Sequence, residues 1–519
     1  MTAVNSSTQS WLEYLIIHYR WVFVCVFLLP ASVLYDIYWT IRNWIVFKLS
    51  SAPAKHDERV KEIQRQVRQW NADGRSTYMC TARPGWQTMS FRQPKYKSIF
   101  TKINCNLVDI LEIDTARRVV RVEPLVNMGQ ITALLIPEGW TLPIVPELDD
   151  LTVGGLIMGA GIETSSHNYG LFQDICVSFE LVLADGSFIK CSKTENSDLF
   201  ECVPWSHGTL GFLVAAELRI ISVKPYVRIE YFPCHSMKQI LDIFNREVRE
   251  NRNEFVEGVV YSIDSAVVMS GTFADKPRSD EQVNPIGTWH KPWFFKHVES
   301  KLKLRFAATS TSSSVEYIPI RDYYHRHSRS LFWEIQDIIP FGNHPLFRYL
   351  LGWAVPPKVG LLKQTQTAAI KRLYESSHFI QDMLVPLNEL ERSLVEFDES
   401  VAIYPLWLCP FSLRPGSGLV HSRFANSDEV SDGEYYVDIG AYGTPGRLAG
   451  FEPKTTTRSL EAFVRSVYGY QMLYADTYMT REEFRVMFDH RLYDEIRKEF
   501  KADTAFPEIY DKISRNARD

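Results

Sequence analysis

The stretch DDLTVGGLIMGAGIETSSHNYG, residues 149–170, contains five glycines among mostly small and aliphatic side chains. Glycine adopts positive φ easily and lets a ligand touch the backbone, so such clusters are typical of loops whose N–H groups point at an anion. The stretch contains no Lys or Arg, so backbone amides would be the donors. It predicts a diphosphate-binding loop. Glycines alone leave a second interpretation open, a turn that is merely packed tightly.

Two common nucleotide-binding motifs fit this stretch poorly. Gly159 and Gly161 give the first two glycines of a dinucleotide fingerprint, but Thr164 occupies the third position. The preceding ELDDLT, residues 147–152, is a poor strand, and the chain has no GKS or GKT. A fold other than the Rossmann or P-loop type is therefore expected.

Length and composition place the chain among folded proteins with more than one core. It has 519 residues, of which 45% are hydrophobic, so two or three folded units are expected. The formal net charge of -5 gives no general attraction to nucleic acid. The eight cysteines form no CxxC pair and no zinc-like cluster with histidine, so we expect reduced thiols and no metal site.

The N-terminal segment WVFVCVFLLPASVLYDIYW, Trp21 to Trp39, is apolar apart from Ser32 and Asp36 and ends in interfacial aromatic residues. Its length suits a bilayer of about 30 Å, so we expect an uncleaved membrane anchor, with a cleaved signal peptide as the alternative. Basic residues are more numerous after the segment than before it, which favours a cytosolic body. Pro30 and Asp36 also allow a monotopic arrangement.

The body of the chain alternates between helix and strand patterns and predicts an α+β or α/β domain up to about Pro225. Aromatic-rich segments follow, and they predict a second domain. The expected elements are an amphipathic helix over 57–70, strands on either side of a turn at 115–117, a helix from 128, a hairpin that turns at 185–186, a strand near 212–223, exposed loops at 308–314 and 414–435, and a helix over 481–500.

Three motifs in order resemble flavoproteins of the vanillyl-alcohol oxidase / p-cresol methylhydroxylase family. They are ARPGW at 82–86, TVGG with GAGIETSSHNYG at 152–170, and DLFECVPWSHGTLGFLVAAEL at 198–218. The resemblance implies an α+β fold with a two-part FAD-binding domain and an α+β cap domain for the substrate. Trp86 stands near the position where many members have a flavin-linking histidine, so FAD is expected to bind without a covalent bond.

The resemblance also implies domain bounds and cofactor contacts. The expected units are a membrane anchor and flank (1–51), an FAD-binding domain (52–225), a cap domain (226–470) and a C-terminal helical segment packed back on the FAD domain (471–519). The implied cofactor-binding residues are Arg83, Pro84, Gly85 and Trp86 in the first loop, Thr152, Val153, Gly154, Gly155, Leu156, Ile157, Met158, Gly159, Ala160, Gly161, Ile162, Glu163 and Thr164 in the second, and Gly208 and Gly211 downstream.

Further motifs across nearly the full length look like one branch of these flavoproteins, the delta-24-sterol reductases (desmosterol reductases, the Diminuto family). They are LSSAP, CTARPGWQTMS, WTLP, PELDDLTVGGLIMG, YYHRH, WEIQDIIPFGN, VPPK and MLYAD. This likeness implies an FAD enzyme of the endoplasmic reticulum membrane that uses NADPH to saturate the side-chain double bond of a sterol. No second dinucleotide motif marks an NADPH site.

An isolated alkene has no neighbouring carbonyl to accept charge, so a proton must lead or accompany the hydride. Protonation at side-chain carbon 24 places positive character on carbon 25, which then accepts hydride from flavin N(5). The candidates for the acid are Tyr474 and Asp476 in MLYAD and His325 or His327 in YYHRH. We favour Tyr474 because a tyrosine keeps its proton at neutral pH, although a core tyrosine is the plainer interpretation.

Alternatives of other classes remain at this stage. One is an FAD oxidase of a sugar lactone or hydroxy acid, which the aromatic second domain disfavours. Another is a flavin- or sterol-binding membrane scaffold without turnover. Residues 340–358, PFGNHPLFRYLLGWAVPPK, are either a core helix or a segment that enters the membrane interface beside the pocket.

Overall fold

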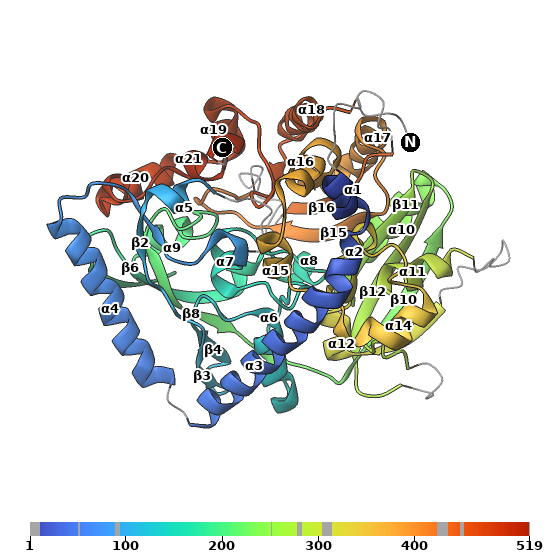
Figure 1. The fold of residues 1–519 in the computed structure, drawn as a ribbon, viewed down its shortest axis with the longest axis horizontal. Helices are drawn as coiled ribbons and strands as arrows, with labels where there is room; N and C mark the ends of the chain where they lie inside the picture. Colours follow the sequence, from blue (N-terminus) through green and yellow to red (C-terminus); the bar gives the residue numbers. More distant parts are fainter. Residues whose placement is uncertain are drawn as a thin grey trace.

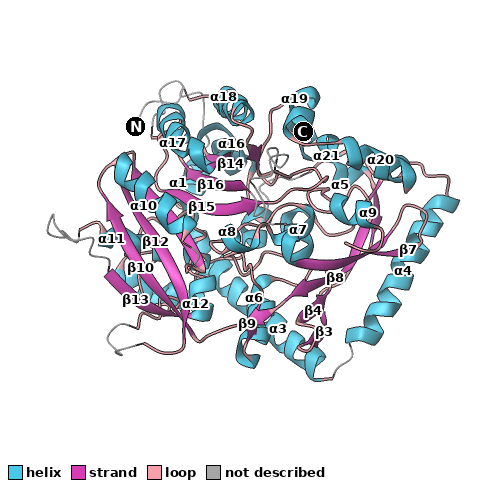
Figure 2. Ribbon diagram, turned by 180° about the vertical axis from the view of Figure 1, so that it is seen from behind, coloured by secondary structure: helices cyan, strands magenta, loops and turns pink. Residues whose placement is uncertain are grey.

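The structure is a computed structural model that describes residues 11–49, 52–88, 94–250, 252–277, 283–303, 314–422, 434–446 and 451–517. Its body has two halves, each built on an antiparallel sheet, and Figure 2 shows the two sheets side by side. This arrangement, with helices packed on antiparallel sheets, is an α+β fold. The predicted loops at 308–314 and 414–435 lie largely outside the described residues.

The first half contains a five-stranded sheet with the order β3-β4-β8-β6-β7. The predicted turn at 115–117 joins β3 to β4, and the predicted hairpin joins β6 to β7 through Gly186, whose φ is +81°. The strands are β3 (Ile110–Asp114), β4 (Val119–Val122), β6 (Cys176–Val182), β7 (Phe188–Ser192) and β8 (Phe212–Arg219). Two small sheets pair β1 (Met79–Thr81) with β2 (Thr101–Ile103) and β5 (Trp140–Thr141) with β9 (Ile221–Ser222).

The helices of this half cover its sheet and loops. The amphipathic pattern at the start of the body forms α4, which buries Val60, Ile63, Val67 and Trp70 as the spacing predicts. The helices are α4 (Ala52–Ala72), α5 (Tyr96–Ile99), α6 (Met128–Leu135), α7 (Val153–Met158), α8 (Ser166–Tyr169) and α9 (Ser197–Cys202).

The second half contains an eight-stranded antiparallel sheet with the order β13-β10-β12-β11-β15-β16-β14-β17. Its strands are β10 (Tyr226–Cys234), β11 (Phe255–Ser262), β12 (Ser265–Ala274), β13 (Ser314–Pro319), β14 (Phe379–Pro386), β15 (Leu406–Leu413), β16 (Glu434–Gly443) and β17 (Tyr470–Gln471). Its helices are α10 (Met237–Arg249), α11 (Phe294–Lys301), α12 (Ile320–Tyr324), α13 (Ile335–Ile338), α14 (Pro345–Leu351), α15 (Val359–Gln364), α16 (Ala368–Ser377), α17 (Leu390–Ser400) and α18 (Pro453–Ser466).

The C-terminal segment returns to the first half. Its helices are α19 (Arg481–Met487), α20 (Arg491–Glu499) and α21 (Ile509–Ile513). The helical pattern expected over 481–500 is confirmed, with an interruption at residues 488–490. Arg497 on α20 is buried and donates hydrogen bonds to the carbonyl oxygens of Thr209, Phe506 and Pro507. The expected boundary at 470/471 falls inside β17, and the predicted domain bounds stay predictions.

The N-terminal helices lie across the front of the body in Figure 1. They are α1 (Trp11–His18), α2 (Arg20–Phe23), a π-helical turn η1 (Val24–Leu28) and α3 (Leu29–Lys48). Pro30 follows the π turn, and a proline lacks the N–H that a regular helix would use there. Of the residues that the structure describes, one helix, Arg20–Val46, is long and apolar enough to cross a bilayer.

Arg497→Met should lower the free energy of unfolding by about 2–4 kcal/mol, because several buried carbonyl oxygens lose their donor at once. Thermal unfolding of the purified chain measures this change. Arg491→Met on the same helix is the matched control, since 86% of the Arg491 side chain is exposed. Equal melting temperatures for the two variants would contradict the role given to Arg497.

Candidate active site

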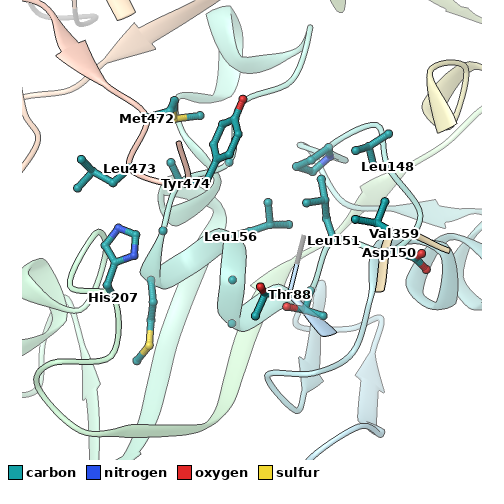
Figure 3. A pocket seen from close by; sticks show the side chains of 18 of the residues that line it. Thr88, Leu148, Asp150, Leu151, Leu156, His207, Val359, Met472, Leu473 and Tyr474 are labelled. Carbon is teal, nitrogen blue, oxygen red and sulfur yellow. The ribbon is translucent and has the colours of Figure 1, made fainter. Parts of the chain in front are cut away.

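A cavity of about 590 Å³ lies between the two halves of the body, which is within the usual range for cofactor and ligand sites. Loops of the first half form one part of its wall, and strands β14 and β16 with the segment after β17 form another. Figure 3 shows Met472, Leu473 and Tyr474 of that segment on one side, with Leu148 and Val359 towards the other end of the view. Apolar side chains contribute most of the lining surface.

The second predicted loop contributes most of the first half's wall. Of the residues predicted to bind the cofactor, those that line the cavity are Arg83, Thr152, Gly154, Gly155, Leu156, Met158, Gly159, Ala160, Gly161, Ile162, Gly208 and Gly211. Val153, Ile157, Glu163 and Thr164 lie behind them as fully buried residues. Pro84, Gly85 and Trp86 belong to the first loop but do not line the cavity directly.

The structure gives the glycines of this loop a different reason from the one expected. Residues 153–158 form α7, and among the glycines of the 149–170 stretch positive φ occurs at Gly170. A Cβ on Gly154 would lie 2.8 Å from Cβ of Pro124, and one on Gly161 would lie 2.7 Å from Cβ of Phe172. Tight packing of the cavity wall therefore requires these glycines. A tightly packed turn and a ligand-facing loop, the two interpretations of the stretch, are thus compatible with each other.

The first loop is held by a residue from the other half. Lys363 on α15 donates hydrogen bonds to the carbonyl oxygens of Gly85 and Thr88, at 2.9 and 3.0 Å. The Lys363 side chain is almost completely buried, so a charge-assisted contact from the protein interior holds the loop in place. The geometry of the first loop consequently depends on the second half of the body.

Two lysines that the glycine-based prediction missed line the same cavity. Lys512 on α21 and Lys97 on α5 both face it. Burial, together with the charge of Lys97, lowers the pKa of Lys512 to about 7. Burial likewise lowers the pKa of Lys97. Neither ammonium has a carboxylate partner among the described residues, so the pair is suited to an anionic ligand. The expectation that backbone amides hold the diphosphate stays a prediction.

The opposite wall contains a cluster of acidic groups from β14, β16 and the segment after β17. Asp382, Asp438, Tyr442 and Tyr474 all line the cavity. The Tyr442 hydroxyl donates to Oδ1 of Asp382 at 2.5 Å, and Tyr474 also hydrogen-bonds to Asp382. We call these four residues the acid cluster.

Burial raises the pKa of both carboxyls in the acid cluster, and the charge of Asp382 raises the pKa of Asp438 further. Oδ1 of Asp438 has no hydrogen-bond partner among the residues that the structure describes. A buried carboxyl group with a raised pKa and an unused oxygen is the arrangement expected of a general acid. No local pattern marks this cluster in the sequence, because the two aspartates lie on separate strands that pair only in the folded sheet.

Aromatic rings stand next to the acid cluster. Phe332, Trp407 and Tyr442 line the cavity, and the ring of Phe332 lies 5.1 Å from that of Trp407 and 5.3 Å from that of Tyr442. The faces of such rings stabilise positive charge, by roughly 0.5–2 kcal/mol each in a dry site.

The other predicted acids lie elsewhere. His327 is fully buried, with Nε2 3.3 Å from Glu257, and burial lowers its pKa. His325 lies between Oγ1 of Thr132 and the carbonyl of Glu147. Neither histidine is among the cavity-lining residues, and neither is Asp476. Tyr474 is thus the one sequence-predicted candidate that the fold places at the cavity.

Buried ion pairs join the second loop to the second half of the body. The guanidinium of Arg326 contacts Glu163 at 3.2 Å and Glu257 of β11 at 2.8 Å, and all three side chains are inaccessible to solvent. With its donors already used here and on the carbonyl of Tyr323, Arg326 is committed to structure.

The residues present fit an FAD molecule. The cavity combines a wall of closely packed backbone in the second loop, two half-buried lysines that have no acidic partner among the described residues, and an apolar centre between the halves. A dinucleotide with a diphosphate and a flat ring system requires these three features.

Comparison with known proteins agrees with the geometry. A family model for an FAD-binding domain matches residues 58–192. The chain is 57% identical to the delta(24)-sterol reductases of mouse and human over 507 residues, which are 98% of this chain and 96% of each relative. It is 47% identical over 519 residues to a delta(24)-sterol reductase homologue of Caenorhabditis elegans, again covering 98% of this chain and 96% of the relative.

Lys512→Met should weaken FAD binding about tenfold or more near pH 6.5, because the anion loses a charged donor. Above about pH 7 the free protein loses the charge on Lys512, so FAD binding takes up a proton and the dissociation constant should rise with pH. Flavin fluorescence titrations measure both effects. The pH dependence should flatten in Lys512→Met and persist in the exposed control Lys498→Met; identical slopes in both variants would exclude the assignment.

Proposed function

This chain belongs to the delta(24)-sterol reductase family, and on that premise we propose how its own residues carry out the reaction. The protein is an FAD-dependent oxidoreductase that acts on a CH–CH group and reduces the delta-24 double bond of sterols. The proposal adds NADPH as the electron donor, non-covalent binding of FAD, the residues that contact it and the source of the proton.

The acid cluster carries the proposal. FAD, when bound, supplies the hydride-transfer chemistry of the reaction, with NADPH as the source of its electrons. The chain has to supply a proton to an alkene carbon, in a site without bulk water. Asp438 is the proposed donor because burial raises its pKa, which favours the protonated form, and Oδ1 has no hydrogen-bond partner among the described residues.

Tyr474 and Tyr442 act on the second carboxyl of the cluster. Both phenols hydrogen-bond to Asp382, and a carboxylate that accepts such bonds is stabilised in its charged form. Asp382 then holds a negative charge near the carbon where positive character develops, while its field keeps the proton on Asp438. Tyr474, favoured from the sequence, therefore becomes a positioning residue in this proposal, and His327 and Asp476 have no part in it.

The aromatic wall serves the same step. Phe332 and Trp407 offer ring faces beside the acid cluster, and such faces lower the energy of a cationic transition state without offering a nucleophile that would trap it. The oxidase alternative has less support, because the chain is similar over nearly its full length to delta(24)-sterol reductases.

The cellular setting is also part of the proposal. The apolar helix Arg20–Val46 associates the protein with a membrane, and the sterol substrate resides in lipid. We assign the protein to the endoplasmic reticulum membrane with its catalytic body in the cytosol, on the basis of the basic residues that follow the helix.

Purified protein supplied with NADPH and a delta-24 sterol should yield a product two mass units heavier, with bound flavin that is released by denaturation. Mass spectrometry of the sterol, flavin absorbance and a peroxide assay are the readouts. Peroxide without sterol reduction would support an oxidase, and bound flavin without either product would support a scaffold; each of these results contradicts the proposal.

Asp438→Asn should lower kcat for sterol reduction by about 10²–10⁴-fold while FAD remains bound, because the amide cannot donate the proton. In the wild type the rate should fall as pH rises through the raised pKa of Asp438, since the donor must be protonated. Asp382→Asn should move this alkaline limb to lower pH, because the charge that raises the pKa of Asp438 is removed.

Tyr474→Phe is the matched control for this prediction, with an expected loss smaller than that of Asp438→Asn. An Asp438→Asn enzyme that retains full turnover and an unchanged pH profile would exclude Asp438 as the donor.

A further inference from the structure

The N-terminal helix has two faces of different character. Toward the body it buries Val24, Leu28, Leu29 and Ser32. The outward side remains apolar, with Leu34, Tyr38, Ile41 and Trp44 each more than half exposed. The helix is therefore packed on the protein along one stripe and unpartnered along another.

The two polar interruptions of the apolar run are both used to fix the helix to the body. Oγ of Ser32 accepts a hydrogen bond from the backbone N–H of Lys358 at 2.8 Å. Nζ of Lys358 bridges Asp36 at 2.8 Å and Asp150 at 2.9 Å. Asp150 lines the cavity, so the helix is joined through one lysine to the wall of the active site.

A second ionic contact fixes the other end of the helix. Arg42 pairs with Asp109, which Arg59 of α4 also contacts at 2.8 Å. Near the start of the helix, the ring of Trp21 packs edge-on against Phe341 at 5.0 Å. Contacts at the start, middle and end of the helix thus hold it along the surface of the body.

A helix held in this way lies parallel to the body and does not project from it. To cross a bilayer it would have to give up the contacts of Ser32, Asp36 and Arg42, and it would carry an unpaired Asp36 into hydrocarbon. That placement costs about 2.5–3.5 kcal/mol for the charge alone. The observed docking avoids the cost, since Asp36 keeps Lys358 as its partner.

A second apolar surface adjoins the helix. Helix α14 and the turn η7 (Gly352–Ala354) after it expose Leu346, Tyr349, Leu350 and Trp353 to between 57% and 65%, and η7 contacts α3. We define the membrane face as these four residues together with Leu34, Tyr38, Ile41, Trp44 and Ile45 of α3. It mixes aliphatic side chains with Trp and Tyr, the composition that suits the boundary between lipid headgroups and acyl chains.

The cavity reaches the N-terminal helices. Arg20 of α2 lines it together with Val359 and Leu362 of α15 and Tyr374 of α16. Nη1 of Arg20 donates to the Tyr374 hydroxyl at 3.1 Å, and η1 contacts α15. Trp21, the residue after Arg20, packs on Phe341, and the ring of Phe341 lies 5.5 Å from that of Phe347 on α14, so these rings connect this part of the wall to α14.

We propose that the N-terminal helix lies along the membrane surface without crossing it, that the membrane face enters the outer part of one lipid leaflet, and that sterol passes from that leaflet into the cavity between α2 and the α15–α16 segment. The occupant of the face is a phospholipid bilayer, because the substrate of this enzyme resides there. The passage of sterol depends on the proposed function, whereas the in-plane helix depends only on the contacts above.

Glycosylation acceptor tags at the two ends of the full chain test the in-plane helix in microsomes. An in-plane helix leaves both ends on the same side, so both tags should have the same modification state, and both should be unmodified if the body is cytosolic. Modification of one tag alone would show a spanning helix and overturn the proposal. Modification of both would keep the in-plane helix and contradict the cytosolic assignment.

Leu350→Glu combined with Trp353→Glu tests the membrane face. The full-length variant should partition into phosphatidylcholine vesicles about tenfold or more less than the wild type in a flotation assay, since two apolar side chains become charged. Val486→Glu is the control, because Val486 is 65% exposed on α19, outside the membrane face. Equal flotation of the two variants would overturn the proposal.

Activity separates this proposal from the proposed function. The double variant should retain FAD and should turn over sterol presented in detergent micelles, while turnover of sterol in vesicles should fall with flotation. If the double variant loses flavin, Leu350→Glu alone takes its place. If the variant changes the oligomeric state in light scattering and leaves flotation unchanged, the face joins two copies of the chain and the proposal is wrong.

Discussion

The guanidinium of Arg326 lies between two carboxylates in the interior, with Glu163 on the loop of the first half and Glu257 on strand β11 of the second. Removing Arg326 would leave two carboxylates buried without a cation, which is far more costly than the ion pairs themselves are favourable. Trp407, whose indole N–H donates to Glu257 at 3.0 Å, is drawn into the same arrangement and reaches the cavity wall. The relative position of the two halves, and hence the shape of the cavity, depends on this contact.

Around that contact the active site is divided by charge. The first half contributes Lys97 and Lys512, which have no acidic partner among the described residues. The second half contributes the acid cluster, whose two carboxyl groups have no basic partner among those residues. Each set would be unfavourable alone, because burial penalises every charged member. A ligand with an anionic end and a reacting carbon that becomes cationic would compensate the lysines and the acid cluster at the same time. The charges of the cavity therefore indicate the chemistry of the ligands that it accepts.

The sequence predicted the parts of the fold that follow local rules. The spacing of Val60, Ile63 and Val67 predicted α4, and the Asp185–Gly186 turn predicted the β6–β7 hairpin, because periodicity and turn chemistry act over a few residues. Motifs also located the loop at 152–164. Sequence reasoning missed Lys512 and Asp438, since each acquires its role only when distant strands and helices come together, and the break at residues 488–490 depends on packing that no local pattern records.

The reason assigned to the glycines shows the same limit. Bare backbone was correctly expected at the cavity wall, yet the steric demand comes from Pro124 and Phe172, which lie elsewhere in the chain and pack behind it. Likewise, Ser32 and Asp36 are polar interruptions of a hydrophobic segment in the sequence. In the fold they hydrogen-bond and ion-pair with Lys358 and hold the helix on the body. A residue that breaks a sequence pattern indicates a special contact, but only the structure identifies the partner in that contact.

Synthesis of the chain reaches the residues of the cavity wall at very different times. The loop at 85–88 is made early but is held by Lys363 of the second half, and Lys512 of the same wall is made after both sheets. The wall is therefore complete only after both halves and α21 have left the ribosome.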